Sequence, residues 1–202
     1  MVFKAKLLGE IYIPIMQIVI NNYGQDDLSW LPQGEVTVYD HKKKNFGYNI
    51  FDYMDWIVKN YDKLDDIVLF TKGNMLKRHI TPEEWDKLKD NKTFTPLLTQ
   101  GHKVDGVINY YDKGLYYEKN DGWYFNHFEH KFYDNYKDFS KDMGLPNPQY
   151  LGFAPGACYL VPRENIVKHP KEFYNKLKEM VEYTQLPAEA HMIERSIYNI
   201  WS

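Results

Sequence analysis

Residues 16–31, MQIVINNYGQDDLSWL, constrain the fold most, because an apolar run ends abruptly in turn-forming polar residues. Gln17 to Ile20 give the β-branched pattern typical of a strand covered on both faces. Residues 21–24 then stop this strand with Asn, Asn, Tyr and Gly. Ligands of open α/β sheets bind beside the carboxyl ends of strands, so we expect a binding site at residues 21–27. The alternative is a strand that ends in an ordinary surface turn.

The composition is that of a folded globular protein. The chain has 202 residues, of which 44% are hydrophobic and 26% charged, so we expect one domain over residues 1–202 with a sizeable core. Aromatic residues make up 17%, and the 18 Tyr permit stacking on sugars or bases, although buried Tyr is commonly core. A formal net charge of −3 gives no global field for nucleic acid, and the basic run at Lys42-Lys43-Lys44 is more simply a solvated loop.

Cysteine usage and hydropathy indicate a cytoplasmic protein. Cys158 is the only cysteine, which excludes an internal disulfide and fits a reducing compartment, and we expect it to be a small core residue. The apolar stretch at residues 7–20 is interrupted by Glu10 and Pro14, is too short to span a bilayer and lacks a cleavage pattern. We therefore expect no membrane span.

Alternating strand and helix patterns predict an α/β fold with a central, mostly parallel sheet flanked by helices. Strands are expected at residues 17–20, 36–39, 67–71 and 157–161, with a weaker one at 94–99, which Pro96 interrupts. Helices are expected at residues 49–64, 82–89, 133–143, 170–183 and 188–201. Residues 144–155, with three prolines and two glycines, are predicted to be a loop. The last helix stops at Ser202, which suits either a natural end or a domain taken from a longer chain.

Several common site motifs do not occur in the sequence. There is no Gly-rich phosphate loop, which argues against a P-loop ATPase or a dinucleotide-binding dehydrogenase. There is no Gly-x-Ser-x-Gly elbow, which argues against a typical α/β-hydrolase. His127 and His130 could offer metal ligands, but an exposed or hydrogen-bonded histidine pair is the simpler interpretation.

Polar residues follow the predicted strands and would suit a nucleotide if they converge. They are Asn21 to Tyr23, Asp40, and Lys72 to Asn74. Asp40 would accept a hydrogen bond from a base or ribose, while Lys72, Arg78 or His79 would meet a pyrophosphate. Ordinary loop polarity is the alternative for each residue taken alone.

The last predicted helix carries a possible general base. Glu194 lies one turn from His191, and Glu189 lies about a turn and a half away. A carboxylate there could deprotonate an acceptor hydroxyl. The alternative is a surface network of Arg and Glu side chains, for example Glu194 with Arg163.

Two sets of residues carry a resemblance to a family of uncharacterised domains from fungi, bacteria and large viruses. In the first half they are Ile18-Val19-Ile20, Tyr23, Asp27 to Leu31, Val36 to Tyr39, Tyr53, Ile57-Val58, Asn60-Tyr61-Asp62, Leu64, Asp66 to Phe70 and Gly73. In the second half they are Gly156-Ala157, Val161, Arg163-Glu164, Ile166, Pro170, Phe173-Tyr174, Glu194-Arg195 and Trp201. The likeness lapses between about His79 and Leu151. These domains, and similar ones from algal viruses, resemble glycosyltransferases of the GT-A fold.

The resemblance implies transfer of a sugar from a nucleotide-sugar, in particular a UDP-sugar, to a glycan hydroxyl, in the host cytoplasm if the protein is viral. It also implies that Asn21, Tyr23 and Asp40 hold the nucleoside. With the residue-level arguments above, the expected catalytic residues are Glu194, Glu189 and His191. The expected donor-binding residues are Asn21, Asn22, Tyr23, Asp27, Asp40, Lys72, Gly73, Asn74, Arg78 and His79, and the expected acceptor-binding residues are Gly156, Ala157 and Tyr159.

The chain departs from the GT-A pattern at two places. Such enzymes usually bind Mn or Mg through an Asp-x-Asp motif, where this chain has Lys72-Gly-Asn74. Lys72 would replace the metal as a fixed cation, or Asn74 together with a carboxylate elsewhere would hold a metal. The family's Gly-Arg-Glu is altered to Gly47-Tyr48-Asn49. A non-catalytic module that binds a nucleotide-sugar or glycan is the runner-up, and a structural or interaction domain is the third alternative.

Overall fold

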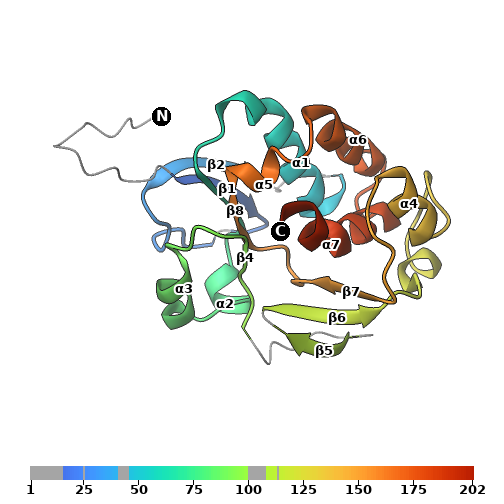
Figure 1. The fold of residues 1–202 in the computed structure, drawn as a ribbon. Coiled ribbons are helices and arrows are strands. Elements are labelled where there is room, and N and C mark those ends of the chain that lie inside the picture. The colour runs from blue at the N-terminus through green and yellow to red at the C-terminus, as the bar shows by residue number, and fades with distance from the viewer. Residues whose placement is uncertain (1–15, 25, 41–45, 100–107, 113) are drawn as a thin grey trace.

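The computed structural model describes residues 16–24, 26–40, 46–99, 108–112 and 114–202 (Figure 1). The lysine run at residues 42–44 lies outside this part of the chain. Within the described residues, five strands form a larger sheet in the order β2-β1-β3-β8-β4, and three strands form a smaller sheet in the order β5-β6-β7. Fold class is therefore mixed α/β, as expected.

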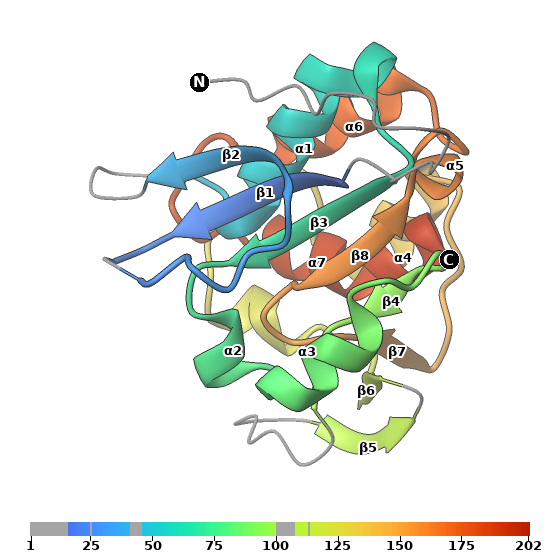
Figure 2. The ribbon, with the colours of Figure 1, turned by 90° about the vertical axis from the view of Figure 1, so that its left-hand side faces the viewer.

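The larger sheet is built on three parallel strands, β1 (Met16–Asn22), β2 (Gly34–Asp40) and β3 (Ile67–Lys72). β8 (Tyr159–Pro162) and the two-residue β4 (Thr95–Pro96) continue the sheet in antiparallel pairing. Asn22 pairs with Asp40, and Asn21 with Lys72, so the three parallel strands end level with one another. Figure 2 shows the carboxyl ends of these strands pointing to the same edge of the molecule.

Helices cover both faces of the larger sheet. Alternate side chains of β1 point to opposite faces, and both faces carry apolar side chains that the helices bury. Val19 belongs to the core beneath α1 (Tyr48–Asn60), α6 (Lys171–Val181) and α7 (Ala188–Trp201). Ile18 and Ile20 belong to the core beneath α2 (Met75–Arg78), α3 (Pro82–Leu88) and the turn at residues 28–31. Trp201 stacks on Phe70 at 5.1 Å between ring centroids, which fixes the end of α7 on β3.

The smaller sheet packs against α7, so that this helix lies between the two sheets (Figure 1). Its strands are β5 (Ile108–Asp112), β6 (Leu115–Lys119) and β7 (Tyr150–Phe153), all antiparallel. The remaining elements are α4 (Tyr136–Asp142), α5 (Arg163–Ile166) and 3₁₀ turns at Tyr61–Lys63 and Trp123–Asn126.

Most expected helices are confirmed, whereas the expectation for residues 144–155 is wrong. That segment contains β7, which pairs with β6 although prolines and glycines surround it. The strand expected at residues 94–99 shrinks to Thr95–Pro96, because proline lacks the N–H that a longer ladder needs. Cys158 is buried, as expected. Among the described helices, none has the length and hydropathy needed to cross a bilayer.

Candidate functional site

The ends of β1 and β3 carry a cation beside two exposed rings. The ammonium of Lys72 lies over the Tyr48 ring, 5.8 Å from its centroid. The Tyr23 ring follows at 5.9 Å from the Tyr48 ring. Tyr23 is 43% exposed and Tyr48 38% exposed, which is unusual for aromatic side chains beside a buried strand end. The three residues offer a ring surface next to a positive charge.

Tyr48 has a strained backbone conformation that neighbouring hydrogen bonds hold in place. Its φ of 57° lies in the left-handed region, which costs a non-glycine residue about 1–3 kcal/mol. The preceding Gly47 also has a positive φ, and its N–H donates to the Thr184 carbonyl while the Tyr48 N–H donates to Gln185. The segment between α6 and α7 therefore fixes the start of α1 and with it the exposed Tyr48 ring.

Glu194 of α7 reaches the same edge of the sheet. Burial raises the pKa of its carboxyl group above the usual value of 4.5, and Arg195, Lys72 and the N–H of Gly156 partly oppose this rise. The side chain as a whole is 19% exposed. A carboxyl group with a raised pKa is a stronger base once it is ionised. Glu194 thus stands as a base candidate near the cation of Lys72.

The loop between β7 and β8 also borders this region. Gly156 has a φ of 94°, and a Cβ at this position would collide with the His79 ring. Ala157 also lies in the left-handed region, with φ 52°, and its carbonyl accepts a 2.9 Å hydrogen bond from the Tyr53 hydroxyl. Two adjacent left-handed residues place the Gly156 N–H against Glu194. Such strain is common where a backbone group has a functional contact.

Two side-chain oxygens converge on Gly73. A Cβ added to Gly73 would meet the Asp26 carboxylate at 3.0 Å and the Asn22 amide oxygen at 3.1 Å. The Gly73 N–H donates to the Asn21 carbonyl at 3.1 Å, and its carbonyl accepts from the Trp30 indole. Because Gly73 has no side chain, the space beside its Cα is bordered by two oxygen atoms of the kind that coordinate cations.

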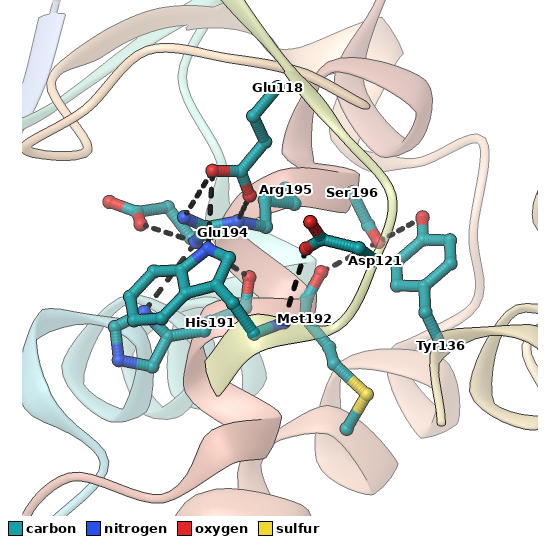
Figure 3. A network of polar contacts seen from close by, with 9 residues as sticks. Glu118, Asp121, Tyr136, His191, Met192, Glu194, Arg195 and Ser196 are labelled. Carbon is teal, nitrogen blue, oxygen red and sulfur yellow. Dashed lines mark hydrogen bonds and ion pairs between the residues drawn. The ribbon is translucent and has the colours of Figure 1, made fainter. Parts of the chain in front are cut away.

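Arg195 connects the smaller sheet to Glu194 (Figure 3). Its guanidinium makes a two-pronged ion pair with Glu118 of β6, and both side chains are almost fully buried. The remaining Nη1 lies 3.4 Å from the Glu194 carboxylate. The Phe153 ring of β7 packs 4.4 Å from the guanidinium. The same Nη1 also donates to the His191 carbonyl at 3.3 Å, so the guanidinium is held on all sides and contacts Glu194 along this edge.

The structure links seven of the predicted site residues, through pairwise contacts, to the ends of β1 and β3 or to the loop between β7 and β8. They are Asn22, Tyr23, Lys72, Gly73, Gly156, Glu194 and, through its contact with Gly156, His79. Ala157 contributes backbone rather than a side chain. Asp40 ends the neighbouring strand β2 and is exposed. The predicted convergence of strand-end residues is thus seen for β1 and β3.

Glu189 and His191 lie elsewhere on α7. The Glu189 carboxylate accepts 2.8 Å hydrogen bonds from the backbone N–H groups of Lys131 and Phe132 and a 2.6 Å bond from the Tyr183 hydroxyl. Glu189 therefore anchors a loop. His191 stacks on Phe128 at 4.5 Å, and burial together with the Arg195 charge lowers its pKa to about 3. Its imidazole is accordingly neutral at pH 7.

The other predicted residues have varied surroundings. Asn21 is fully buried and donates to the Asp52 carboxylate at 2.6 Å, so it faces α1. Tyr159 is buried and stacks on Phe94. Asp27 is exposed and accepts from the Ser29 N–H, which lowers its pKa. Arg78 is exposed at the end of α2, and Asn74 precedes that helix with its amide oxygen buried.

Sequence reasoning missed Asp26, Tyr48 and Glu118. Asp26 adjoins the predicted Asp27 in the same loop, and only the loop path shows which of the two carboxylates approaches Gly73. Tyr48 had a weak signal, as the middle residue of Gly47-Tyr48-Asn49. Glu118 had no signal, because its partner Arg195 lies 77 positions away.

Metal ligation finds limited support. The described residues contain no group of three or more His, Cys, Asp or Glu side chains arranged to hold an ion. His130 lies 3.5 Å from the Asp134 carboxylate, and His127 packs against Trp123.

Comparison with known proteins adds no relative. No family model, no curated protein and no solved structure matches the chain.

Proposed function

We propose that the chain is a GT-A-type glycosyltransferase that moves a sugar from a nucleotide-sugar, in particular a UDP-sugar, to a glycan hydroxyl. The observation that carries the proposal is the Lys72 ammonium beside two exposed tyrosine rings near the carboxyl ends of β1 and β3, together with the Glu194 carboxyl, whose pKa the Lys72 charge lowers. This edge of an open α/β sheet is where nucleotide ligands bind. The resemblance set out above supports the same function.

Donor binding follows from the two rings and the cation. The base would stack on Tyr23 and Tyr48, whose exposed faces suit an aromatic ligand. The diphosphate would then lie against the Lys72 ammonium, which compensates the negative charge that develops as the diphosphate departs. Lys72 would thus act most strongly in the transition state, which is where a fixed charge accelerates the reaction.

Sugar transfer would use Glu194 as general base. In the inverting form of the reaction, the Glu194 carboxylate takes the proton of the acceptor hydroxyl while that oxygen bonds to the anomeric carbon. The bond from this carbon to the diphosphate oxygen breaks in the same step, and the electron pair leaves with the nucleoside diphosphate. Arg195 and the Gly156 N–H hold the carboxylate in place.

A divalent metal would fit beside Gly73. Asp26 and Asn22 offer a carboxylate and an amide oxygen around the space left by the absent side chain, and Mg or Mn commonly takes one or two carboxylates together with substrate phosphates. A bound ion would supply further positive charge for the diphosphate.

The test begins with calorimetric titration of UDP, UDP-glucose and GDP-mannose, each with and without Mn. The best ligand is then assayed for release of its nucleoside diphosphate. We expect one nucleotide-sugar to bind and to be slowly hydrolysed. Lys72→Met should weaken binding by about tenfold or more, because a charge-assisted phosphate contact is lost. Lys141→Met, on the exposed face of α4, is the matched control and should bind like the wild type.

The main alternative is a binding module that retains the fold without turnover. It predicts that the protein binds a nucleotide-sugar tightly but releases no nucleoside diphosphate, with or without the Glu194→Gln substitution. Absence of binding by all three nucleotides to the folded protein would contradict both the transferase and this module.

A further inference from the structure

A cavity of about 550 Å³ opens between α3, β4 and the β5–β6 hairpin. Its volume falls within the range of about 300–1,000 Å³ typical of small-molecule sites. None of the side chains that gather at the ends of β1 and β3 lines it. Figure 2 shows α3, β4 and β5 in the lower half of the molecule, whereas the carboxyl ends of the parallel strands point to the left. The cavity is therefore separate from the candidate site.

Aromatic and aliphatic side chains form one part of the cavity wall. Phe94, Leu98 and Tyr111 contribute apolar surface. Each ring is fixed by a second ring, since Phe94 stacks on Tyr159 at 5.7 Å and Tyr111 meets Tyr116 edge-on at 5.1 Å. Rings that are already held lose little freedom when a ligand packs on them. This part of the wall suits a flat ligand face made of C–H groups.

Polar groups of both charges form the other part of the wall. The Glu84 carboxylate accepts from the Thr99 hydroxyl and the Thr81 N–H, which lowers its pKa, so Glu84 is ionised at neutral pH. Lys87 follows three residues later on α3, and Asn91 adds an amide. Opposite charges one helical turn apart largely cancel, so the cavity has no preference for a phosphate or other anion. It suits an uncharged ligand with many hydroxyl groups.

We propose that this cavity binds a neutral carbohydrate segment. The C–H face of a pyranose ring would pack on Phe94 and Tyr111, while its hydroxyls donate to Glu84 and accept from Lys87 and Asn91. The Thr99 N–H also donates to the His79 carbonyl at 2.8 Å, which ties this wall to a residue of the candidate site. Where the proposed function holds, the bound segment is the part of the glycan acceptor remote from the reacting hydroxyl.

The test is a titration of the ¹⁵N-labelled chain with four neutral disaccharides, maltose, cellobiose, lactose and diacetylchitobiose, followed by amide chemical shifts. We expect at least one to give saturable shifts at Lys87, Asn91, Thr93 and Gly114. Glu84→Gln keeps the capping box of α3, because Gln serves in that motif, and should weaken binding about fivefold through loss of the charged acceptor. Glu83→Gln is the matched control on the same helix, and it should bind like the wild type because Glu83 does not line the cavity.

Three results would overturn this assignment. They are no saturable shift with any of the four disaccharides, shifts confined to Lys72, Gly73 and Glu194, and equal weakening in the Glu83 and Glu84 variants. Nucleotide binding is measured separately, so disaccharide binding without nucleotide binding would leave the cavity assignment standing and contradict the transferase. Nucleotide turnover without disaccharide binding would do the reverse.

Discussion

Glu194 is the residue on which the proposed chemistry depends most directly. Glu194→Gln keeps the shape of the side chain but removes its basicity, so we expect kcat to fall by about 10²–10⁴-fold while nucleotide affinity stays near that of the wild type. The wild-type rate should fall as the pH drops through the raised pKa of Glu194, above 4.5, because only the ionised carboxylate accepts a proton. Steady-state rates between pH 4 and 9 measure both effects. An unchanged kcat in the variant would remove Glu194 from the mechanism.

Arg195 should affect both the pKa of Glu194 and the stability of the folded chain. Arg195→Met removes a cation that lowers the pKa of Glu194, so the acid limb of the rate profile should move to higher pH. The same change leaves the buried Glu118 carboxylate unpaired, and we expect a loss of about 3–5 kcal/mol in the free energy of unfolding. Chemical denaturation measures this loss.

Replacing both members of the pair separates the two roles of Arg195. Glu118→Leu together with Arg195→Met removes the buried Glu118 carboxylate that Arg195→Met alone leaves unpaired, so most of the stability lost through that group should return. The pH profile should remain displaced, because Glu194 still lacks its cation. A profile that returned with stability would mean that Arg195 has a structural role alone.

At the residue scale, the sequence pointed to candidate site residues by their place in an element. Lys72, Tyr23 and Glu194 were named because each follows a recognisable strand or lies on an amphipathic helix, and their functional roles stay predictions. The environments of Glu189 and Asn21 were not predicted, since each turns toward a partner more than five residues away in the chain, Tyr183 and Asp52 respectively. Spacing along one element predicts which face a residue occupies, but not which residue from a distant part of the chain contacts it there.

Among the structural elements, the β7–β8 loop gives the sharpest test of how backbone shape builds the site. Gly156→Ala adds a Cβ at φ 94° that would collide with the His79 ring, and it should displace the N–H that faces Glu194. We expect a loss of about 1–3 kcal/mol in stability, from thermal melts, and a fall in kcat. Gly144→Ala is the control, because Gly144 also has a positive φ, of 66°, but open space around its Cα. Equal effects of the two changes on kcat would show that the steric contact with His79 is unimportant.

Elements with strong local signals were the ones that sequence reasoning placed correctly. The capping box at Thr81 and Glu84 marks the start of α3 through contacts within three residues, and the structure has both hydrogen bonds. β7 is defined instead by its pairing with β6, from Tyr116 with Phe153 to Lys119 with Tyr150, and nothing in its own residues signals this. Long-range pairing therefore accounts for β7 being missed.

On the scale of the whole molecule, α7 joins the two sheets into one body. Trp201 stacks on Phe70 of the larger sheet, and Arg195 pairs with Glu118 of the smaller one. Glu194 is positioned by the same packing, because it immediately precedes Arg195 on this helix. The candidate site thus depends on how both sheets pack rather than on a local motif.

The stability of the whole molecule should depend on pH through Asp52, which lies buried between α1 and β1. Burial and the nearby Asp55 raise its pKa from 3.8 to about 8. Between these values the folded chain holds a proton that the unfolded chain releases, so this carboxyl makes folding less favourable as the pH rises from about 4 to about 8.

Asp52→Asn should remove that dependence, because the amide stays neutral and its oxygen still accepts from the Asn21 side chain. We expect the variant to match the wild type near pH 4 and to exceed its free energy of unfolding by on the order of 2–4 kcal/mol at pH 9. Urea unfolding at intervals between pH 4 and 9 follows this divergence. Asp62→Asn, at an exposed carboxylate, should leave the wild-type curve unchanged. Parallel curves for Asp52→Asn and the wild type would mean that Asp52 is ionised in the folded protein throughout this range, and water or a cation would then have to reach the space between α1 and the larger sheet.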